Sequence, residues 1–367
     1  MRYTAFHLDS ERGLRGGERQ LLYLAAWLRA QGHGSVVACR AGVPLEAEAR
    51  KRGLDVLTLP YSGELCPATA WRLARAASAA ENPVLHAHTA HTAGNAAFAR
   101  LLGGPRWVAH RRVDFHLSGP LSARLKYGSA ARLIAVSAFI KGVLAEDGIA
   151  PSRVDVVPDA LPFGADEEAL AGTAPWGRGD RTLLRSRLGL KAEGPYVGNV
   201  AALVGHKDQA NLVRAIPAVL EKEPRAEFLF VGDGPLRPDL ERLVAQLGVG
   251  ASVRFVGQQE DPRPWLGALD VYCQPSWGEG MGSVLLEAMA SRVPVVATTA
   301  GGIPEVVEDG RSARLVPPRN PAALAQALLA ALADRDGSRR RAEAAAADLP
   351  RFSLEALGSK TLAAYAP

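Results

Sequence analysis

The chain has 367 residues, of which 48% are hydrophobic and 22% charged, a composition typical of a globular protein and not of a disordered or fibrous one. Its length exceeds what one hydrophobic core usually serves, so two domains are expected. No apolar run approaches the ~18–20 residues of a membrane span. The N-terminal residues MRYTAFHLDSERG lack the apolar core of a signal peptide, which predicts a cytoplasmic protein. The scattered cysteines Cys39, Cys66 and Cys273 indicate reduced thiols and not a disulfide framework or a zinc site.

The net charge of +5 is unevenly distributed along the chain. Residues 1–165 carry 20 Lys and Arg against 13 Asp and Glu, whereas residues 166–367 carry 23 against 25. This asymmetry predicts an anionic partner for the first half. The basic residues are not interleaved with stacking aromatics in an RNA-binding pattern, so no nucleic acid is expected. An anionic lipid surface or a phosphorylated glycan fits better.

Short apolar runs alternate with helical patterns through the first half, which predicts a parallel sheet covered on both faces. An amphipathic helix with Leu21, Leu24 and Leu28 on one face is expected to end at Gly32. Ser137 is expected to cap the helix that starts at Ala138. Strands are predicted at 3–8, 35–39, 56–59, 84–87, 107–109, 133–136 and 154–157, with further helices starting near Pro44, Pro67, His91 and Leu121.

A segment rich in Pro, Gly and Ala over residues 160–180 predicts a linker between two domains. A second alternating pattern follows it. Asp208 is expected to cap the helix after His206 and Lys207, and Asn320 with Pro321 is expected to start a late helix. Strands are predicted at 196–200, 227–231, 253–256, 271–274, 293–297 and 313–316.

The stretch from Gln274 to Glu305, QPSWGEGMGSVLLEAMASRVPVVATTAGGIPE, carries the strongest functional signal. A strand end leads into a glycine-rich loop, a helix from Ser283, a buried strand and a second glycine turn. The amides and the positive dipole end of such a loop and helix suit a phosphate. Glu279 lies in the loop, and Glu287 is expected two turns into the helix, where a carboxylate can accept hydrogen bonds from sugar hydroxyls.

Two glutamates eight residues apart within PSxxEGxGxxxLEAMAxxxPVVAT, followed by GGIPE and DG, resemble the donor site of the retaining glycosyltransferases of family four. The resemblance covers most of the second half closely and the first half more loosely. It implies the α/β GT-B fold, with two Rossmann-like domains facing across a cleft and a C-terminal helix crossing back to the first domain. The implied division is 1–165 with the helix 353–367 for the acceptor-side domain, and 166–352 for the donor domain.

The resemblance also implies roles for individual residues. Lys207 and the amides of Gly280, Met281 and Gly282 would meet the diphosphate, Glu279 a hydroxyl of the donor sugar, and Glu287 the ribose. Ser283 would be a further donor-binding residue. Gly234 resembles the turn beside the nucleotide. No metal and no cofactor beyond the sugar nucleotide are expected.

Two features of the first half are ambiguous from the residues alone. Gly16 and Gly17 follow the first strand and are either a tight turn before a helix or, as in the family, a loop that approaches the donor's phosphates. They are not spaced as a dinucleotide fingerprint. His110 ends a predicted strand, where the family places a histidine beside the reacting sugar; a structural histidine is the alternative.

The sequence HAHTAH places His86, His88 and His91 close together. The spacing of His88 and His91 would require a helix, whereas His86 and His88 end a strand. Because no nearby carboxylate or cysteine completes a ligand set, we expect a polar cluster at the sheet edge and not a zinc site.

Residues 100–132 combine seven basic residues with the single acid Asp114. The apolar residues among them are Leu101, Leu102, Trp107, Phe115, Leu121, Leu125 and Tyr127. This mixture predicts either peripheral contact with an anionic membrane on its inner face or a solvated face whose apolar residues belong to the core.

Two positions depart from the family pattern. Ala202 replaces an arginine that usually precedes the phosphate-binding lysine, and Arg292 replaces a usual glycine. The predicted activity is transfer of a hexose-type sugar, with retention of configuration, from a nucleoside diphosphate sugar to a hydroxyl of a glycan or lipid-linked acceptor, in cell-envelope or polysaccharide biosynthesis. The alternatives are a nucleotide-sugar 2-epimerase of the same fold and a non-catalytic sugar-nucleotide-binding partner.

Overall fold

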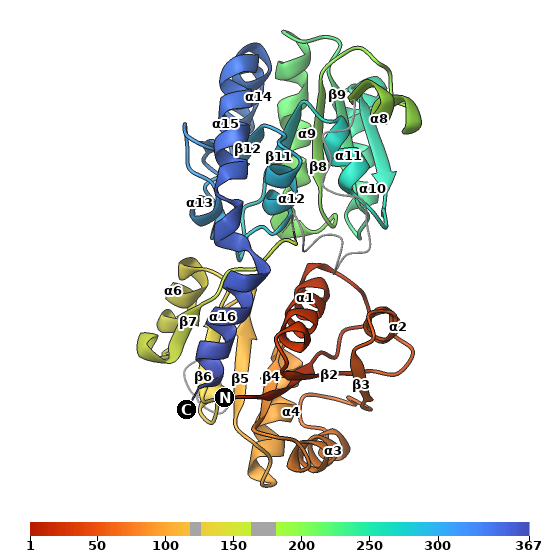
Figure 1. Cartoon of the computed structure of the whole chain (residues 1–367). Coiled ribbons are helices and arrows are strands. Elements are labelled where there is room, and N and C mark those ends of the chain that lie inside the picture. Colours follow the sequence, from red (N-terminus) through yellow and green to blue (C-terminus); the bar gives the residue numbers. More distant parts are fainter. Residues whose placement is uncertain (118–125, 163–180, 367) are drawn as a thin grey trace. The chain divides into compact units, whose positions relative to one another are not determined.

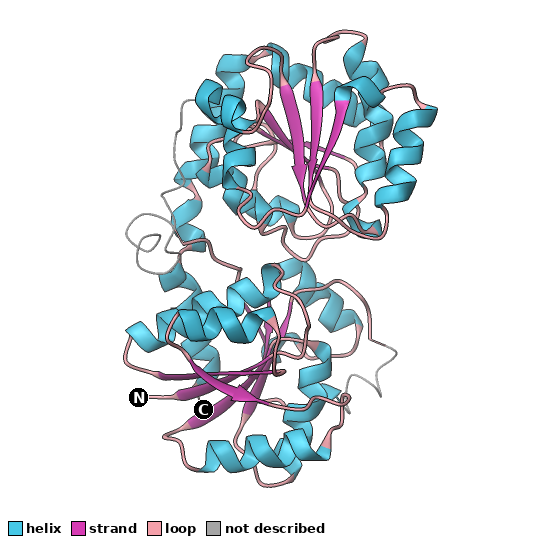
Figure 2. Cartoon of the chain, turned by 90° about the vertical axis from the view of Figure 1, so that its right-hand side faces the viewer, coloured by secondary structure: helices cyan, strands magenta, loops and turns pink. Residues whose placement is uncertain are grey.

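The computed structural model describes residues 1–117, 126–162 and 181–366. The chain forms two compact units, Met1–Gly172 with Phe352–Pro367, and Thr173–Arg351. Each is a parallel sheet with helices on both faces (Figure 2). None of the helices in the described ranges combines the length and the apolar character needed to cross a bilayer.

The first unit contains a parallel sheet in the order β3-β2-β1-β4-β5-β6-β7 (Figure 1). Because β1 is flanked by β2 on one side and β4 on the other, the strand order reverses between β1 and β4. Its strands are β1 Thr4–Leu8, β2 Gly34–Cys39, β3 Asp55–Thr58, β4 Pro83–Ala87, β5 Trp107–Arg111, β6 Arg132–Ala135 and β7 Val154–Val156. Its helices are α1 Gly16–Ala30, α2 Pro44–Lys51, α3 Pro67–Ser78, α4 Ala90–Leu101, α6 Ala138–Glu146 and α16 Leu354–Tyr365.

The C-terminal helix α16 packs within the first unit, as predicted (Figure 1). Leu354, Leu357 and Tyr365 are buried with Trp27 and Leu28 of α1 in one apolar cluster. A Cβ at Gly358 would lie 2.0 Å from a ring carbon of Trp27, so the two helices approach as closely as only a glycine permits. Glycine therefore sets the spacing between α16 and α1.

The second unit has a sheet in the order β10-β9-β8-β11-β12-β13, which reverses between β8 and β11. Its strands are β8 Tyr196–Val200, β9 Glu227–Val231, β10 Val253–Gly257, β11 Val271–Gln274, β12 Val295–Thr298 and β13 Arg314–Val316. Its helices are α8 Arg181–Arg187, α9 Gln209–Leu220, α10 Arg237–Gln246, α11 Arg263–Ala268, α12 Val284–Ala290, α13 Ile303–Val306, α14 Pro321–Ala333 and α15 Arg335–Ala347.

Every predicted strand is present within one or two residues at each end. The side chains of Ser137 and Asn320 cap their helices as predicted. Asp208 does not, because it adopts a left-handed backbone conformation with φ 47° and makes no side-chain cap bond. The helix predicted from Leu121 and most of the predicted linker lie outside the described residues.

Several of the apolar residues between 100 and 132 belong to the core. Trp107 is fully buried and Tyr127 is 3% exposed. Leu101 and Phe115, by contrast, are 80% and 59% exposed, whereas Leu121 and Leu125 lie outside the described residues. Only part of the apolar set is therefore available at the surface.

Candidate active site

The strongest cluster of predicted residues lies in the second unit, at the carboxyl ends of β8 and β11. The strand order reverses between these two strands, and in open parallel sheets that point is where ligands bind. After β8 the chain forms a short 3-10 turn, Gly205–Lys207. After β11 it forms the loop that contains Ser276 and Glu279.

Glu279 is the centre of this cluster. Its Oε1 atom accepts hydrogen bonds from Lys207 Nζ at 2.6 Å, Gln274 Nε2 at 2.7 Å and Ser276 Oγ at 2.8 Å. Glu279 is 5% exposed, and three donors on one oxygen offset the cost of burying its polar group. The carboxylate is thus fixed in place, with its orientation set by the end of β11.

Lys207 and Glu279, which the sequence assigned to separate tasks, form an ion pair. The two segments are also joined by backbone bonds, since the amide of Trp277 donates to the carbonyl of His206 at 2.9 Å. The Lys207 side chain is 21% exposed and so is reachable from solvent. A cation beside a polar, glycine-rich loop suits an anionic ligand.

The glycines of the loop are required by close contacts. Gly282 has φ 85°, and a Cβ there would lie 2.6 Å from Gln274 Nε2. Gly301 has φ 55°, and a Cβ would lie 1.9 Å from the carbonyl oxygen of Glu279. Met281, which precedes Gly282, is 4% exposed. The glycines therefore let the second turn, near Gly302, pack directly on the backbone of Glu279.

Glu287 lies in the first turn of α12 and not two turns into it. The helix begins at Val284, after Ser283, whose side chain makes no cap bond. The position predicted for Glu287 was wrong because only four residues separate it from Ser283, which is about one helical turn. A carboxylate in the first turn is favoured by the helix dipole.

Gly234 lies in the same unit, in the turn after β9. A Cβ at Gly234 would meet the carbonyl oxygen of Leu203 at 2.5 Å. The amide of Leu203 also donates to the carbonyl of Asp233 at 3.0 Å. The turn therefore packs on the backbone just before Lys207.

The two departures from the family pattern have structural consequences. Ala202 is exposed and contributes only its carbonyl, which accepts from Gln209 Nε2 at 3.0 Å. Arg292 has φ 52°, a conformation that favours glycine, and its guanidinium pairs with Glu343. Neither side chain contributes to the hydrogen bonds given above for Glu279.

In the first unit, Gly16 and Gly17 are the first two residues of α1. A Cβ on Gly17 would have no atom within 4 Å. The amide of Arg15 is held by Glu18 Oε2 at 2.7 Å, which closes the start of the helix. The glycines therefore form a helix N-terminus, and the local packing does not require glycine at position 17.

His110 lies on β5, is 5% exposed, and both of its ring nitrogens lack a partner among the described residues. Its ring lies 5.6 Å from that of His86 and 5.8 Å from that of His88. Burial, and then the charge of Arg112, lowers the pKa of His110 well below its usual value. The imidazole is therefore neutral at pH 7, able to donate one hydrogen bond and accept another.

His7 is a residue that the sequence reasoning missed. It lies on β1 opposite His86 of β4, and its Nδ1 atom lies 3.1 Å from Nε2 of His88. Burial lowers the pKa of His7 to about 3. His91, which the sequence grouped with His86 and His88, is instead on α4 with its side chain 61% exposed.

Asp9, which follows β1, was also missed. Burial and the nearby carboxylate of Glu18 raise its pKa to about 7. Arg112 Nε donates to Asp159 at 2.9 Å, and Arg112 Nη1 lies 3.2 Å from Nδ1 of His88. A buried row of titratable groups therefore lines the carboxyl edge of this sheet. The pattern of charged and apolar residues in the sequence did not indicate that these groups lie together.

Comparison with known proteins identifies the family. Residues 194–334 match the model of glycosyl transferases group 1, and residues 14–161 match that of glycosyltransferase family 4. The D-inositol 3-phosphate glycosyltransferase of Nocardia farcinica (strain IFM 10152) is 34% identical over 288 residues, which are 76% of this chain and 60% of the relative. The lipopolysaccharide core biosynthesis glycosyltransferase LpsE of Rhizobium meliloti (strain 1021) is 33% identical over 174 residues, 47% of this chain and 50% of the relative.

The chain thus spans half to three fifths of the length of these relatives. Among solved structures, Anabaena Alr3699/HepE in complex with UDP and glucose superposes with a TM-score of 0.82 at 23% identity, over 99% of both chains. That likeness concerns the fold. With two Rossmann-like units and both family models matched, the chain belongs to the group 1 glycosyltransferases of family four, which have the GT-B fold.

Proposed function

We propose that this protein transfers a hexose-type sugar from a nucleoside diphosphate sugar to a hydroxyl group of a glycan or lipid-linked acceptor, with retention of anomeric configuration. The observation that carries the proposal is the Lys207–Glu279 pair beside the glycine loop and α12, at the point where the strand order of the second sheet reverses. This arrangement places a cation, the backbone of a glycine-rich loop and an oriented carboxylate within one short segment.

The proposed roles follow from that chemistry. Lys207 and the amides of Gly280 to Gly282 would stabilise the charge that develops on the departing diphosphate, without a metal ion. The free lone pairs of Glu279 would accept a hydrogen bond from a hydroxyl of the donor sugar. Glu287 would bind the ribose. On the first unit, Gly16, Gly17 and His110 are the proposed contacts to the donor.

The acceptor is proposed to be anionic, since the first 165 residues carry the excess of positive charge. The relatives named above act in inositol phosphate and lipopolysaccharide core glycosylation. Exposed Leu101 and Phe115 beside the basic residues of 100–132 further support peripheral contact with anionic lipid. Flotation with vesicles of phosphatidylcholine alone and with added phosphatidylglycerol tests that contact, and equal partitioning would exclude it.

Acceptor-dependent nucleotide release tests the proposed activity. The protein is first screened by thermal shift against UDP, GDP and ADP, because a bound ligand raises stability by mass action. The matching sugar nucleotides are then incubated with candidate acceptors such as inositol phosphate and a lipopolysaccharide core fragment. A transferase releases nucleotide only with an acceptor, and the anomeric proton of the product reports retention.

Two other outcomes would contradict the proposal. Conversion of the sugar nucleotide without an acceptor would indicate a 2-epimerase. Binding of the nucleotide with no turnover under any acceptor would indicate a non-catalytic binding partner. A Glu279→Gln variant that keeps full turnover would overturn the assignment of this site while leaving the activity itself in place.

A further inference from the structure

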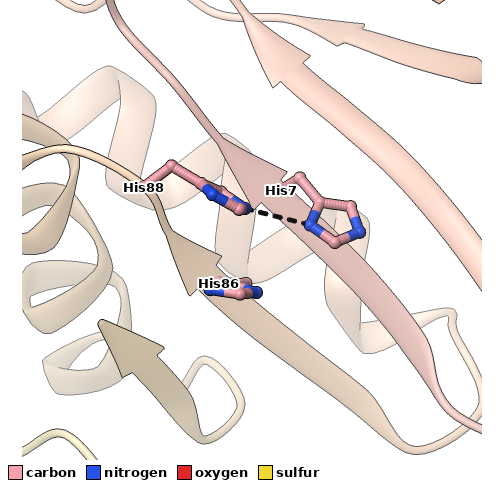
Figure 3. A group of neighbouring side chains, drawn as sticks. All are labelled: His7, His86 and His88. Carbon is pink, nitrogen blue, oxygen red and sulfur yellow. Dashed lines mark hydrogen bonds between the residues drawn. The ribbon is translucent and has the colours of Figure 1, made fainter. Parts of the chain in front are cut away.

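Three histidines from two neighbouring strands meet at the carboxyl edge of the first sheet. His7, His86 and His88 each offer one ring nitrogen, and these three atoms lie within 4.8 Å of one another (Figure 3). His7 pairs with His86 in the register of β1 and β4, and His88 is two residues further along. Side chains two residues apart project from the same face of a strand, which brings all three rings together. The sequence considered only nearby carboxylates and cysteines as completing ligands, whereas His7 comes from a strand 79 residues earlier in the chain than His86.

The spacing of the nitrogens fits one ion. In Figure 3, His7 Nδ1 faces His88 Nε2 at 3.1 Å, and two nitrogens bound to one tetrahedral ion at about 2.0–2.1 Å lie about 3.4 Å apart. His86 Nδ1 is 2.7 Å from the hydroxyl of Tyr365, which would accept its N–H as a metal-bound histidine requires. His86 Nε2 has no partner among the described residues.

The burial of the cluster adds to the case. His7 and His86 are fully buried and His88 is 7% exposed, so unpartnered ring nitrogens are costly there. Coordination of one ion would give His86 Nε2 a partner in this buried setting.

We propose that His7, His86 and His88 form a binding site for a divalent transition-metal ion such as Zn²⁺, Co²⁺ or Ni²⁺. Imidazole nitrogen suits these ions, whereas Mg²⁺ and Ca²⁺ require oxygen ligands. Three imidazoles leave one position of a tetrahedral ion for a fourth ligand. The site consists of residues of the first unit alone, and the proposal does not depend on the transferase activity.

Arg112 is expected to weaken binding of the ion to these histidines. Its Nη1 faces Nδ1 of His88 at 3.2 Å, where a metal-bound histidine would instead need an acceptor for its own N–H. Its charge also repels a cation in a buried setting. Asp159 pairs with Arg112 at 2.9 Å and offsets part of that charge, and Asp9 also interacts with Arg112.

The test is a Co²⁺ and Zn²⁺ titration of the full, tag-free chain after treatment with chelator. Visible absorption of tetrahedral Co²⁺ and equilibrium dialysis with Zn²⁺ are expected to give one ion per chain. His7→Asn and His88→Asn are each expected to abolish that binding. His91→Asn, in the same stretch but with an exposed side chain, is the matched control and is expected to bind as the parent does.

In Arg112→Gln the positive charge is removed, and the amide carbonyl of the new glutamine can accept the N–H of His88. Metal binding is therefore expected to tighten about tenfold. A misfolded variant would not bind the metal more tightly. The proposal is overturned if the parent chain binds no more metal than His7→Asn, if His91→Asn removes binding, or if Arg112→Gln weakens it.

Discussion

Lys207 and Glu279 show how one buried carboxylate can organise a loop. Glu279 would be costly to bury alone, but Lys207, Gln274 and Ser276 each donate to the same oxygen. Its second carboxylate oxygen has none of these three bonds. The residue is therefore fixed by one oxygen and available for ligand hydrogen bonds through the other.

Replacing Lys207 with methionine keeps the length of the side chain and removes its charge. Glu279 retains Gln274 and Ser276, so the fold is expected to persist. We expect kcat to fall about 10²–10³-fold, the usual cost of losing one group that stabilises charge in the transition state. Acceptor-dependent nucleotide release measures this. Lys222→Met, at an exposed position of the same unit, is the control, and an equal effect of both substitutions would contradict the role of Lys207.

At Gly17 a substitution is expected to affect stability and ligand binding in opposite directions. A Cβ there meets nothing within 4 Å, and alanine is the better helix former, so Gly17→Ala is expected to raise the free energy of unfolding by about 0.5 kcal/mol. A methyl group at a helix N-terminus would at the same time hold a phosphate away from the amides. We therefore expect a higher melting temperature together with a higher KM for the sugar nucleotide. A variant with unchanged kinetics would show that Gly17 does not approach the donor.

At the scale of elements, the sequence predicted the strands and helix starts that depend on residues close together in the chain. Apolar runs between turn residues gave the strands, and Ser137 and Asn320 gave two helix starts. The sequence-based predictions failed for features that depend on a particular backbone conformation or on contacts between distant segments. Asp208 has a positive φ that prevents capping, and His7 meets His88 across 81 residues because β1 and β4 are neighbours in the sheet. Strand order is set by packing, which local patterns do not encode.

The contact between α16 and α1 depends on Gly358. A Cβ at this position would lie 2.0–2.4 Å from three ring carbons of Trp27, and Trp27 is 7% exposed and so has little room to move. Gly358→Ala is expected to lower the free energy of unfolding by about 1–3 kcal/mol, the usual cost of overpacking. Urea unfolding measures this loss.

Helix α16 also contains Tyr365, whose hydroxyl contacts the ring of His86. Gly358→Ala therefore also tests whether this contact depends on the packing of α16. Ser359→Ala, the next residue along α16 and exposed, is the control and is expected to change stability by less than about 0.5 kcal/mol. Equal stability of Gly358→Ala and the parent would mean that α16 shifts along α1 without cost.

For the whole molecule, the buried histidines of the first unit predict sensitivity to acid. Burial lowers the pKa of His7 to about 3, and it lowers those of His86, His88 and His110 well below their usual value. Below the unfolded pKa of about 6.5 the unfolded chain binds protons that the native state does not. Stability is therefore full above about pH 6.5 and falls as the pH is lowered, by up to about 1.4 kcal/mol per pH unit for each histidine.

Asp9 acts in the opposite direction, because its pKa is raised to about 7 in the folded state. Between its unfolded pKa and pH 7 the native state binds the extra proton, so this one group gains stability as the pH falls. One acid does not balance four histidines, and the net effect of lowering the pH from 7 to 5.5 is destabilisation. Hydrogen exchange of β1 and β4, measured with chelator present to keep metals away, is expected to accelerate over this range. In His7→Gln, which has one fewer group to protonate, the acceleration is expected to be smaller. An exchange rate of β1 that does not depend on pH, after correction for intrinsic exchange, would contradict a cluster of neutral buried histidines.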